Sequence, residues 1–314
     1  MSKVQVILKS SPQNAWIAVS IANRLKSTDT FSYLVEEDKH KIKEQLDTEA
    51  EVVLMVGYSF KEQSDPGLRE FLTEHFDVPF SECYWVTPYG EVLQNTGINF
   101  VTTQDNDSLI GNLNSTLNNS AFFEPVESDE VVEAIHSYYT WTWEGKNMSG
   151  VYLMELYRLY GTGLIELYQH TSIKSMLSQN LELLKNALAK RNHYIQTHSS
   201  GSYISEIKLG EDQFVTFGVI EAEDYINDVA SSLMGTMASY YRVALVVSST
   251  NHYDTRISVR SQHVNCLEIA RILDSSAQGK PQAASVFLRL PNQLQQVVDT
   301  LANLATPNIN SMLN

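Results

Sequence analysis

Short apolar runs alternate with amphipathic segments through the first half of the chain. Residues 3–8 form a run rich in β-branched side chains, which predicts a strand. Residues 14–26 follow with apolar side chains at a spacing near 3.6, which predicts a helix. Further apolar runs of strand length lie at 51–56 and 83–86. Strands that alternate with helices indicate right-handed βαβ units and therefore a parallel sheet.

Helical patterns dominate the rest of this half. A short apolar run at 98–103 could add one more strand. The periodicity predicts helices at residues 68–75, 107–117, 129–137, 150–168 and 170–189. We expect these helices to pack on the far side of the domain.

A polar run at 196–202 separates this helical pattern from an extended one and predicts a domain boundary. We therefore divide the chain into a first domain at 1–195 and a smaller α/β domain at 203–314. Within the second domain the pattern predicts strands at 214–220, 242–248 and 255–260, and helices at 225–239 and 266–272. Residues 293–304 predict an amphipathic helix that could dock on its own chain or on a partner.

Length and composition fit a globular protein of two domains. The chain has 314 residues, which is ample for a buried core. No stretch approaches the roughly 20 apolar residues needed to cross a bilayer, and no secretory signal is visible, so we expect a cytoplasmic protein. Cys83 and Cys266 lie in a predicted strand and at the start of a predicted helix, where buried thiols are the usual outcome.

The charge balance narrows the choice of partners. The formal net charge is −15, with 37 acidic and 22 basic residues. A long duplex is gripped through clusters of lysine and arginine, which this sequence lacks, so extended nucleic acid is disfavoured as a partner. A nucleotide or short oligonucleotide remains compatible, because a small ligand responds to the field of one cleft. A protein partner is equally compatible with the acidic composition.

Two segments near the C-terminus carry a resemblance to a known family. Residues 256–261 read Arg-Ile-Ser-Val-Arg-Ser, and residues 274–285 contain Gly-Lys-Pro-Gln-Ala-Ala. Together they resemble the strand and the glycine-rich loop that bind substrate phosphates in the DHH/DHHA1 phosphoesterases. The resemblance implies a substrate-binding set of Ser258, Arg260, Ser261, Gly279 and Lys280. An arginine fork suits a phosphate because it can donate two parallel hydrogen bonds.

Four segments of the first half resemble, in order, the metal-site motifs of the same superfamily, in particular its nanoRNase or oligoribonuclease-like branch. They lie at 11–18, 51–60, 83–90 and 135–143. The positions that match the family's metal ligands are Gln13, Gly57, Thr87, Pro88, Tyr89 and Tyr139. The resemblance implies an N-terminal DHH-like domain with a parallel sheet flanked by helices, followed by a DHHA1-like domain.

The chemistry of the family needs two divalent cations, Mn²⁺ or Mg²⁺, bridged by carboxylates. None of the side chains at the matching positions is a carboxylate or an imidazole. We therefore interpret the chain as a catalytically inactive relative, with no metal cofactor, that binds a nucleotide or oligonucleotide or serves as a protein scaffold.

Two alternatives stay open on the sequence alone. The chain could be an active phosphodiesterase whose remodelled metal site uses Asp105, Asp107 or His136. It could also be a partner-binding subunit that holds no small ligand. The aromatic set Tyr138, Tyr139, Trp141 and Trp143 could stack a base, although core packing is the commoner use of such a run.

Overall fold

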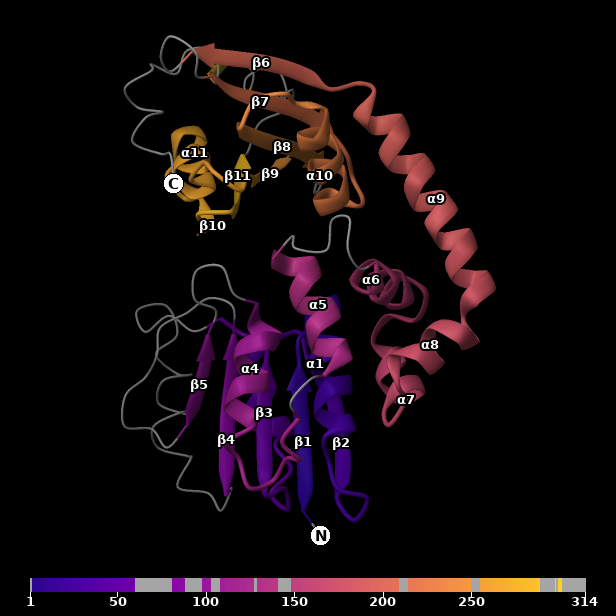
Figure 1. Ribbon diagram of the computed structural model, residues 1–314. Coiled ribbons are helices and arrows are strands. Elements are labelled where there is room, and N and C mark those ends of the chain that lie inside the picture. Colours follow the sequence, from indigo (N-terminus) through magenta and orange to yellow (C-terminus); the bar gives the residue numbers. More distant parts are fainter. Residues whose placement is uncertain are drawn as a thin grey trace. The chain divides into compact units, whose positions relative to one another are not determined.

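The chain folds into two compact units, which are described separately here. A computed structural model describes residues 2–59, 81–87, 98–102, 108–126, 129–140, 148–208, 214–249, 255–288, 297 and 299–300. Unit 1 spans Met1–Lys185 and unit 2 spans Asn186–Asn314. Both contain a sheet and helices, so the expected α/β class is confirmed (Figure 1).

Unit 1 is built on a five-stranded parallel sheet. Its strand order is β2-β1-β3-β4-β5. The bounds are β1 Lys3–Leu8, β2 Thr30–Val35, β3 Val52–Val56, β4 Glu82–Thr87 and β5 Asn99–Thr102. The central strands are buried on both faces, which explains why they read as continuous apolar runs rather than as alternating ones. Alternate residues feed two separate hydrophobic clusters, one on each face of the sheet.

The helices of unit 1 pack chiefly on one face of this sheet (Figure 1). Their bounds are α1 Pro12–Asn23, α2 Ile42–Gln45, α4 Leu109–Leu117, α5 Glu130–Thr140, α6 Ser149–Tyr160, α7 Leu164–Tyr168 and α8 Ile173–Gln179. Short 3-10 turns lie at η1 Lys39–Lys41 and η2 Gly161–Gly163. α1 is almost wholly buried, because its apolar residues occur on every side of the helix.

Two long helices expected in unit 1 are each divided. The helix expected at 150–168 is interrupted at Gly161, whose φ of +57° ends α6. The helix expected at 170–189 is interrupted at Asn180, whose side-chain amide donates to the Tyr168 hydroxyl at 2.7 Å. β2 was not expected at all, since its half-exposed residues give no strong apolar run.

Unit 2 contains a six-stranded mixed sheet with the order β10-β11-β9-β8-β7-β6. Among the described strands, β7 and β8 pair in parallel, and the other pairs are antiparallel. The bounds are β6 Tyr203–Lys208, β7 Phe214–Glu221, β8 Tyr241–Ser249, β9 Thr255–Arg260, β10 Gln278–Lys280 and β11 Ala283–Leu288. The helices α10 Ile226–Thr236 and α11 Cys266–Leu273 complete it, close to the expected ranges.

The helix α9 Leu181–Ser199 crosses the division between the units. The compact units divide between Lys185 and Asn186, whereas the sequence placed the boundary after residue 195, near the end of the same helix. The assignment of 1–195 and 203–314 as domains stays a prediction.

Parts of the sequence predictions fall outside the described residues. They are the helix at 68–75 and, apart from residues 297 and 299–300, the tail helix at 293–304. In the parts of the chain that the structure describes, every helix is too short or too polar to span a lipid bilayer.

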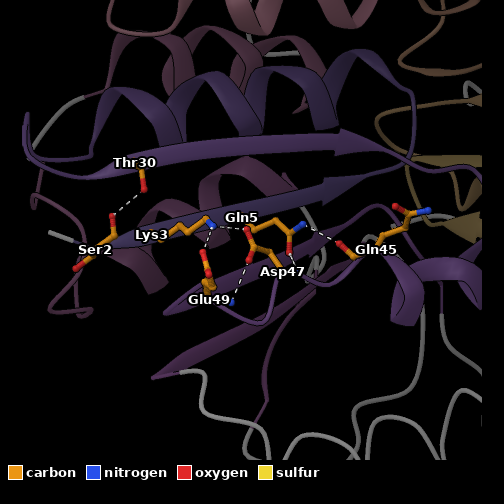
Figure 2. Close-up of polar contacts among 7 residues, drawn as sticks. All are labelled: Ser2, Lys3, Gln5, Thr30, Gln45, Asp47 and Glu49. Atoms are coloured by element: carbon orange, nitrogen blue, oxygen red, sulfur yellow. Dashed lines mark hydrogen bonds and ion pairs between the residues drawn. The ribbon is translucent and has the colours of Figure 1, made fainter.

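A polar cluster holds the segment after α2 against β1 (Figure 2). The Lys3 ammonium lies 2.7 Å from an Asp47 carboxylate oxygen and 3.1 Å from one of Glu49. The nearly buried Gln5 side chain donates to the Gln45 carbonyl and accepts from the Asp47 N–H, both at 2.8 Å. These contacts fix the approach of the chain to β3.

We predict that Asp47→Asn lowers the free energy of unfolding slightly at neutral pH. The hydrogen bond from Lys3 lowers the pKa of Asp47 below its ordinary value of 3.8. A carboxyl group with a depressed folded pKa stabilises the fold above its unfolded pKa, and this stabilisation is lost as the pH falls through the folded pKa. Urea unfolding should therefore separate the variant from the wild type at pH 7, and the difference should vanish in strong acid. Glu44→Gln, at an exposed position of α2, is the control and should have no effect.

A buried ion pair ties α9 to α10 within unit 2. An Arg191 guanidinium nitrogen lies 2.6 Å from an Asp228 carboxylate oxygen, with both side chains almost completely buried. Asp228→Ala should cost roughly 3–5 kcal/mol in unfolding free energy, because it leaves a buried guanidinium without its counter-charge. Glu268→Ala removes the exposed pair with Arg271 and should cost about 1 kcal/mol or less. Equal losses in urea unfolding would contradict this ranking.

Candidate functional site

The carboxyl ends of β1, β3 and β4 meet at one edge of the parallel sheet, which is where open α/β sheets bind ligands. α1 starts at this edge directly after β1. Its N-cap is Ser11, whose hydroxyl accepts a hydrogen bond from the Asn14 N–H at 3.2 Å. Gln13, the first position matched to a metal ligand, therefore lies in the first turn of α1.

Gly57 follows β3 at the same edge, and the Asn14 side chain packs directly against it. Its φ is +91°, and its N–H donates to the Val86 carbonyl at 2.7 Å. A Cβ atom at this position would lie 2.1 Å from the Asn14 side-chain nitrogen. That nitrogen is itself held by the Lys9 carbonyl at 2.8 Å, and Asn14 is 5% exposed. The Asn14 amide therefore occupies the space in which an aspartate at 57 would begin.

Tyr139 reaches the same place from α5. Its hydroxyl accepts a hydrogen bond from the backbone N–H of Gln13, and burial is the main reason why its pKa is raised. The orphan N–H groups of the first turn of α1 are thus shared between Ser11 and Tyr139. Thr87, the last residue of β4, is completely buried. Ser137, which with Tyr139 stands where the resembled motif has an acidic pair, donates to the Ala134 carbonyl within its own helix.

The structure thus brings Gln13 and Tyr139 into direct contact and places Gly57 against the next residue, Asn14. These residues do not fit a two-metal centre, since they offer an amide, no side chain and a protonated phenol where hard cations require carboxylates or imidazoles. In the described part of the chain, no cluster of three His, Cys, Asp or Glu side chains could hold a metal ion. The remaining positions named from the sequence, Pro88, Tyr89, Asp105, Asp107, Trp141 and Trp143, lie outside the described residues.

His136 belongs to a different local arrangement on α5. Its Nδ1 lies 2.8 Å from the Ser108 hydroxyl, and this hydroxyl also caps α4 by accepting from the Gly111 N–H at 3.2 Å. This contact gives His136 a structural role at the start of α4. Its use as a metal ligand stays a prediction.

The substrate-binding set predicted in unit 2 is only partly assembled into one site. Ala283 of β11 pairs with Arg260 on one side and with Lys280 on the other, so both cationic side chains point to the same face of the sheet. Arg260 is held by α10, because its Nε donates to the Asn227 side-chain oxygen at 3.1 Å. Another guanidinium nitrogen donates to the Val259 and Ala284 carbonyls at 2.9 and 3.2 Å.

The other members of this substrate-binding set are buried or make contacts within the fold itself. Ser258 is completely buried. The Ser261 hydroxyl donates to the Arg242 carbonyl at 2.6 Å and accepts from the Val264 N–H at 3.0 Å. Gly279 lies in β10, where a Cβ would be 2.4 Å from the Ala284 Cα. The segment expected to form a phosphate-binding loop therefore includes a strand, and Gly279 is required by its close pairing with β11.

Asn14 is the residue that the sequence prediction missed. It follows Gln13 directly and was read only as part of a helix. The one signal for it is the N-cap pattern of Ser11-Pro12, which orients the first turn of α1.

Comparisons with known proteins now add to this geometry. No protein-family model matches the chain, and no curated protein matches it in sequence. Among solved structures, the chain is similar to a DHH domain from a member of the s1p family of ribosomal proteins. The TM-score is 0.58 at 11% identity, covering 95% of this chain and 85% of that one. At this identity the likeness concerns the fold alone, so the chain has the fold of a DHH-domain protein, as the sequence resemblance implied.

A second similar structure is an exopolyphosphatase-related protein from Bacteroides fragilis. It has 9% identity and covers 99% of this chain and 92% of that one. Its TM-score of 0.47 is too low to support an argument.

We predict that Gly57→Asp destabilises the protein by about 2 kcal/mol or more, since a non-glycine residue at positive φ costs about 1–2 kcal/mol and the Asn14 amide must also move. Asn14→Ala removes the obstructing atoms, so the cost of Gly57→Asp should be smaller in that background. A double-mutant cycle by urea unfolding measures this coupling. Strictly additive effects would contradict the proposed contact.

Proposed function

We propose that the chain is a catalytically inactive protein of the DHH phosphoesterase-like fold that acts as a binding module. The observation that carries this proposal is the packing of the Asn14 amide against Gly57. It fills the position from which the family's bridging aspartate would extend. Both the backbone conformation of Gly57 and the neighbouring Asn14 side chain oppose a carboxylate at this position.

The neighbouring positions support the same conclusion. The first turn of α1 is capped internally by Ser11 and Tyr139 rather than left to bind an anion. Tyr139 is a phenol, which is protonated at neutral pH, and burial raises its pKa further. A neutral phenol is a poor ligand for Mn²⁺ or Mg²⁺.

We propose a nucleotide or short oligonucleotide as the ligand, bound in unit 2. The specific observation in favour is that Arg260 and Lys280 lie on the same face of the sheet, because each pairs with Ala283 from a neighbouring strand. Two cations on one face of a sheet provide a local positive field in a chain of net charge −15. Hydrogen bonds to Asn227 and to the Val259 and Ala284 carbonyls hold the Arg260 guanidinium in place. Less conformational entropy of this side chain is then lost when a phosphate binds. A protein scaffold without a small ligand is the second candidate.

The test is a titration of the protein with a hexa-adenylate RNA in the presence of Mn²⁺, with chromatography of the same mixture to detect cleavage. We expect binding without release of mononucleotides. Arg260→Ala should weaken binding by roughly tenfold or more, because charge-assisted hydrogen bonds to phosphate contribute about 1.5–3 kcal/mol. Gln13→Ala should bind as the wild type does.

Arg260→Lys keeps the charge and removes the planar fork. It should bind with intermediate affinity while both variants keep the wild-type circular dichroism. Because Arg260 also donates to Asn227, Val259 and Ala284, urea unfolding of each variant is measured beside its binding, so that a folding defect is recognised. Release of mononucleotides that depends on Mn²⁺ would overturn the proposal and support the remodelled metal site. If the RNA does not bind, the nucleotide hypothesis is wrong and the protein-scaffold hypothesis remains.

A further inference from the structure

The strand β6 forms one outer edge of the unit 2 sheet (Figure 1). It consists of residues 203–208 and pairs with β7 in antiparallel fashion along its whole length. Among the described strands, none pairs with its other side. A strand at the edge of a sheet carries backbone N–H and C=O groups that a further strand can bond. β6 is therefore a template for one more strand.

The side chains of β6 do little to protect this edge. Edge strands are commonly shielded by proline, by a bulge or by charged side chains. β6 contains no proline, and its pairing with β7 runs without a break from Tyr203 to Lys208. Its two charged residues lie in its second half. In the first half, Tyr203 and Ile204 are 50% and 47% exposed, so the edge offers apolar side chains beside its backbone groups.

The two faces of β6 differ. One face carries the residues that pair with core residues of β7, which are Tyr203, Ser205 and Ile207. The opposite face carries Ile204, Glu206 and Lys208, because successive side chains of a strand alternate between faces. A further strand must match this alternation, so that like faces continue across the new pair.

A second copy of β6 meets this condition through two-fold symmetry. When two antiparallel strands are related by an axis perpendicular to the sheet, their faces stay aligned and one residue lies opposite its own copy. A centre at Ser205 pairs residues 203–207 of each strand, and a centre at Glu206 pairs residues 204–208. Any other centre within β6 pairs a shorter stretch.

The charges decide between these two registers. The register centred on Glu206 sets two carboxylates directly opposite each other, which is unfavourable. In the register centred on Ser205, Glu206 lies opposite Ile204 of the second copy instead. Tyr203 lies opposite Ile207, and pairs of an aromatic with a β-branched side chain stabilise antiparallel sheets. By symmetry each of these pairs occurs twice.

We propose that β6 pairs with β6 of a second copy of this chain, antiparallel and centred on Ser205, so that the two unit 2 sheets become one. Each chain has one β6, so the pairing closes at a dimer. The chain has a net charge of −15, but β6 carries one acidic and one basic residue, so the two edges meet without a net charge of their own.

The strength of this dimer follows from the size of the contact. One pair of short strands buries less than the roughly 1,200 Å² at which stable interfaces begin, so the dimer should dissociate on dilution. This inference is independent of the proposed nucleotide ligand, and its failure would leave that proposal unchanged.

Cysteine cross-linking of the full chain tests the register. Ser205→Cys sets two thiols opposite each other, and paired Cα atoms of antiparallel strands lie about 4.5–5.5 Å apart, within the reach of a disulfide. Mild oxidation should therefore give a covalent dimer on a non-reducing gel. Lys208→Cys, at the exposed end of β6, is the control, since its two copies would lie roughly 20 Å apart along the strands. The natural Cys83 and Cys266 are both buried.

Sedimentation equilibrium over a range of protein concentrations tests the same edge without cysteine. Ile204→Glu would set like charges opposite each other at Glu206 and should weaken the dimer roughly tenfold, because two such pairs form. Ile204→Lys would set opposite charges there and should strengthen the dimer. Leu167→Glu, at a 54% exposed position of α7 in unit 1, is the control and should have no effect.

The outcomes separate the proposed dimer from its alternatives. If Ile204→Glu and Ile204→Lys change the dimer equally, or if Lys208→Cys cross-links as readily as Ser205→Cys, the register is wrong and the proposal with it. A dimer that none of these variants affects would form through another surface and would also contradict the proposal. A folded wild type that stays monomeric at every concentration would exclude a second copy and leave the edge to an extended segment of another protein.

Discussion

The contact between Asn14 and Gly57 is the constraint on which the carboxyl edge of the parallel sheet depends. The positive φ of Gly57 lets the chain leave β3 and donate to the Val86 carbonyl, and the absence of a side chain admits the Asn14 amide. That amide is in turn anchored on the Lys9 carbonyl, at the end of β1. Gly57 therefore links the carboxyl ends of β1, β3 and β4 to the first turn of α1, through its contacts with Val86 and Asn14. A carboxylate at this position would require a strained backbone conformation and a movement of the Asn14 side chain.

Unit 2 differs from this edge of unit 1, because one face of its sheet carries polar residues of β9. One face of β9 supplies the apolar core, and the other carries Arg256, Arg260 and the buried Ser258, with the exposed ring of Phe287 across from them. Burying such groups costs free energy unless they are hydrogen-bonded, as Arg260 is to Asn227 and to two backbone carbonyls. The two units therefore differ in how their polar groups are used, since the polar groups at the unit 1 edge mainly bond to one another, whereas two buried polar atoms of this face have no hydrogen-bond partner in the described part of the chain.

Much of the fold could be predicted from the sequence because its strands are short apolar runs with clear limits. β1 and β9 match their predicted ranges, and α4, α10 and α11 lie within a few residues of theirs. The failures arose where tertiary contacts decide the outcome. Asn180 interrupts a helical pattern through its bond to Tyr168, and β2 is held mainly by pairing with β1. The site positions could be named from motif order, whereas the role of Asn14 depends on a contact across 43 residues of sequence that periodicity does not encode.

The central proposal is that the carboxyl edge of unit 1 does not bind two divalent cations. Electron paramagnetic resonance of Mn²⁺ measures this directly, because the signal of the free aqueous ion falls when the ion binds to a protein. On titration of the purified protein with Mn²⁺ at neutral pH, our account predicts that the free signal rises in proportion to the added ion. Loss of the first two equivalents from the free signal, together with exchange coupling between neighbouring ions, would contradict it.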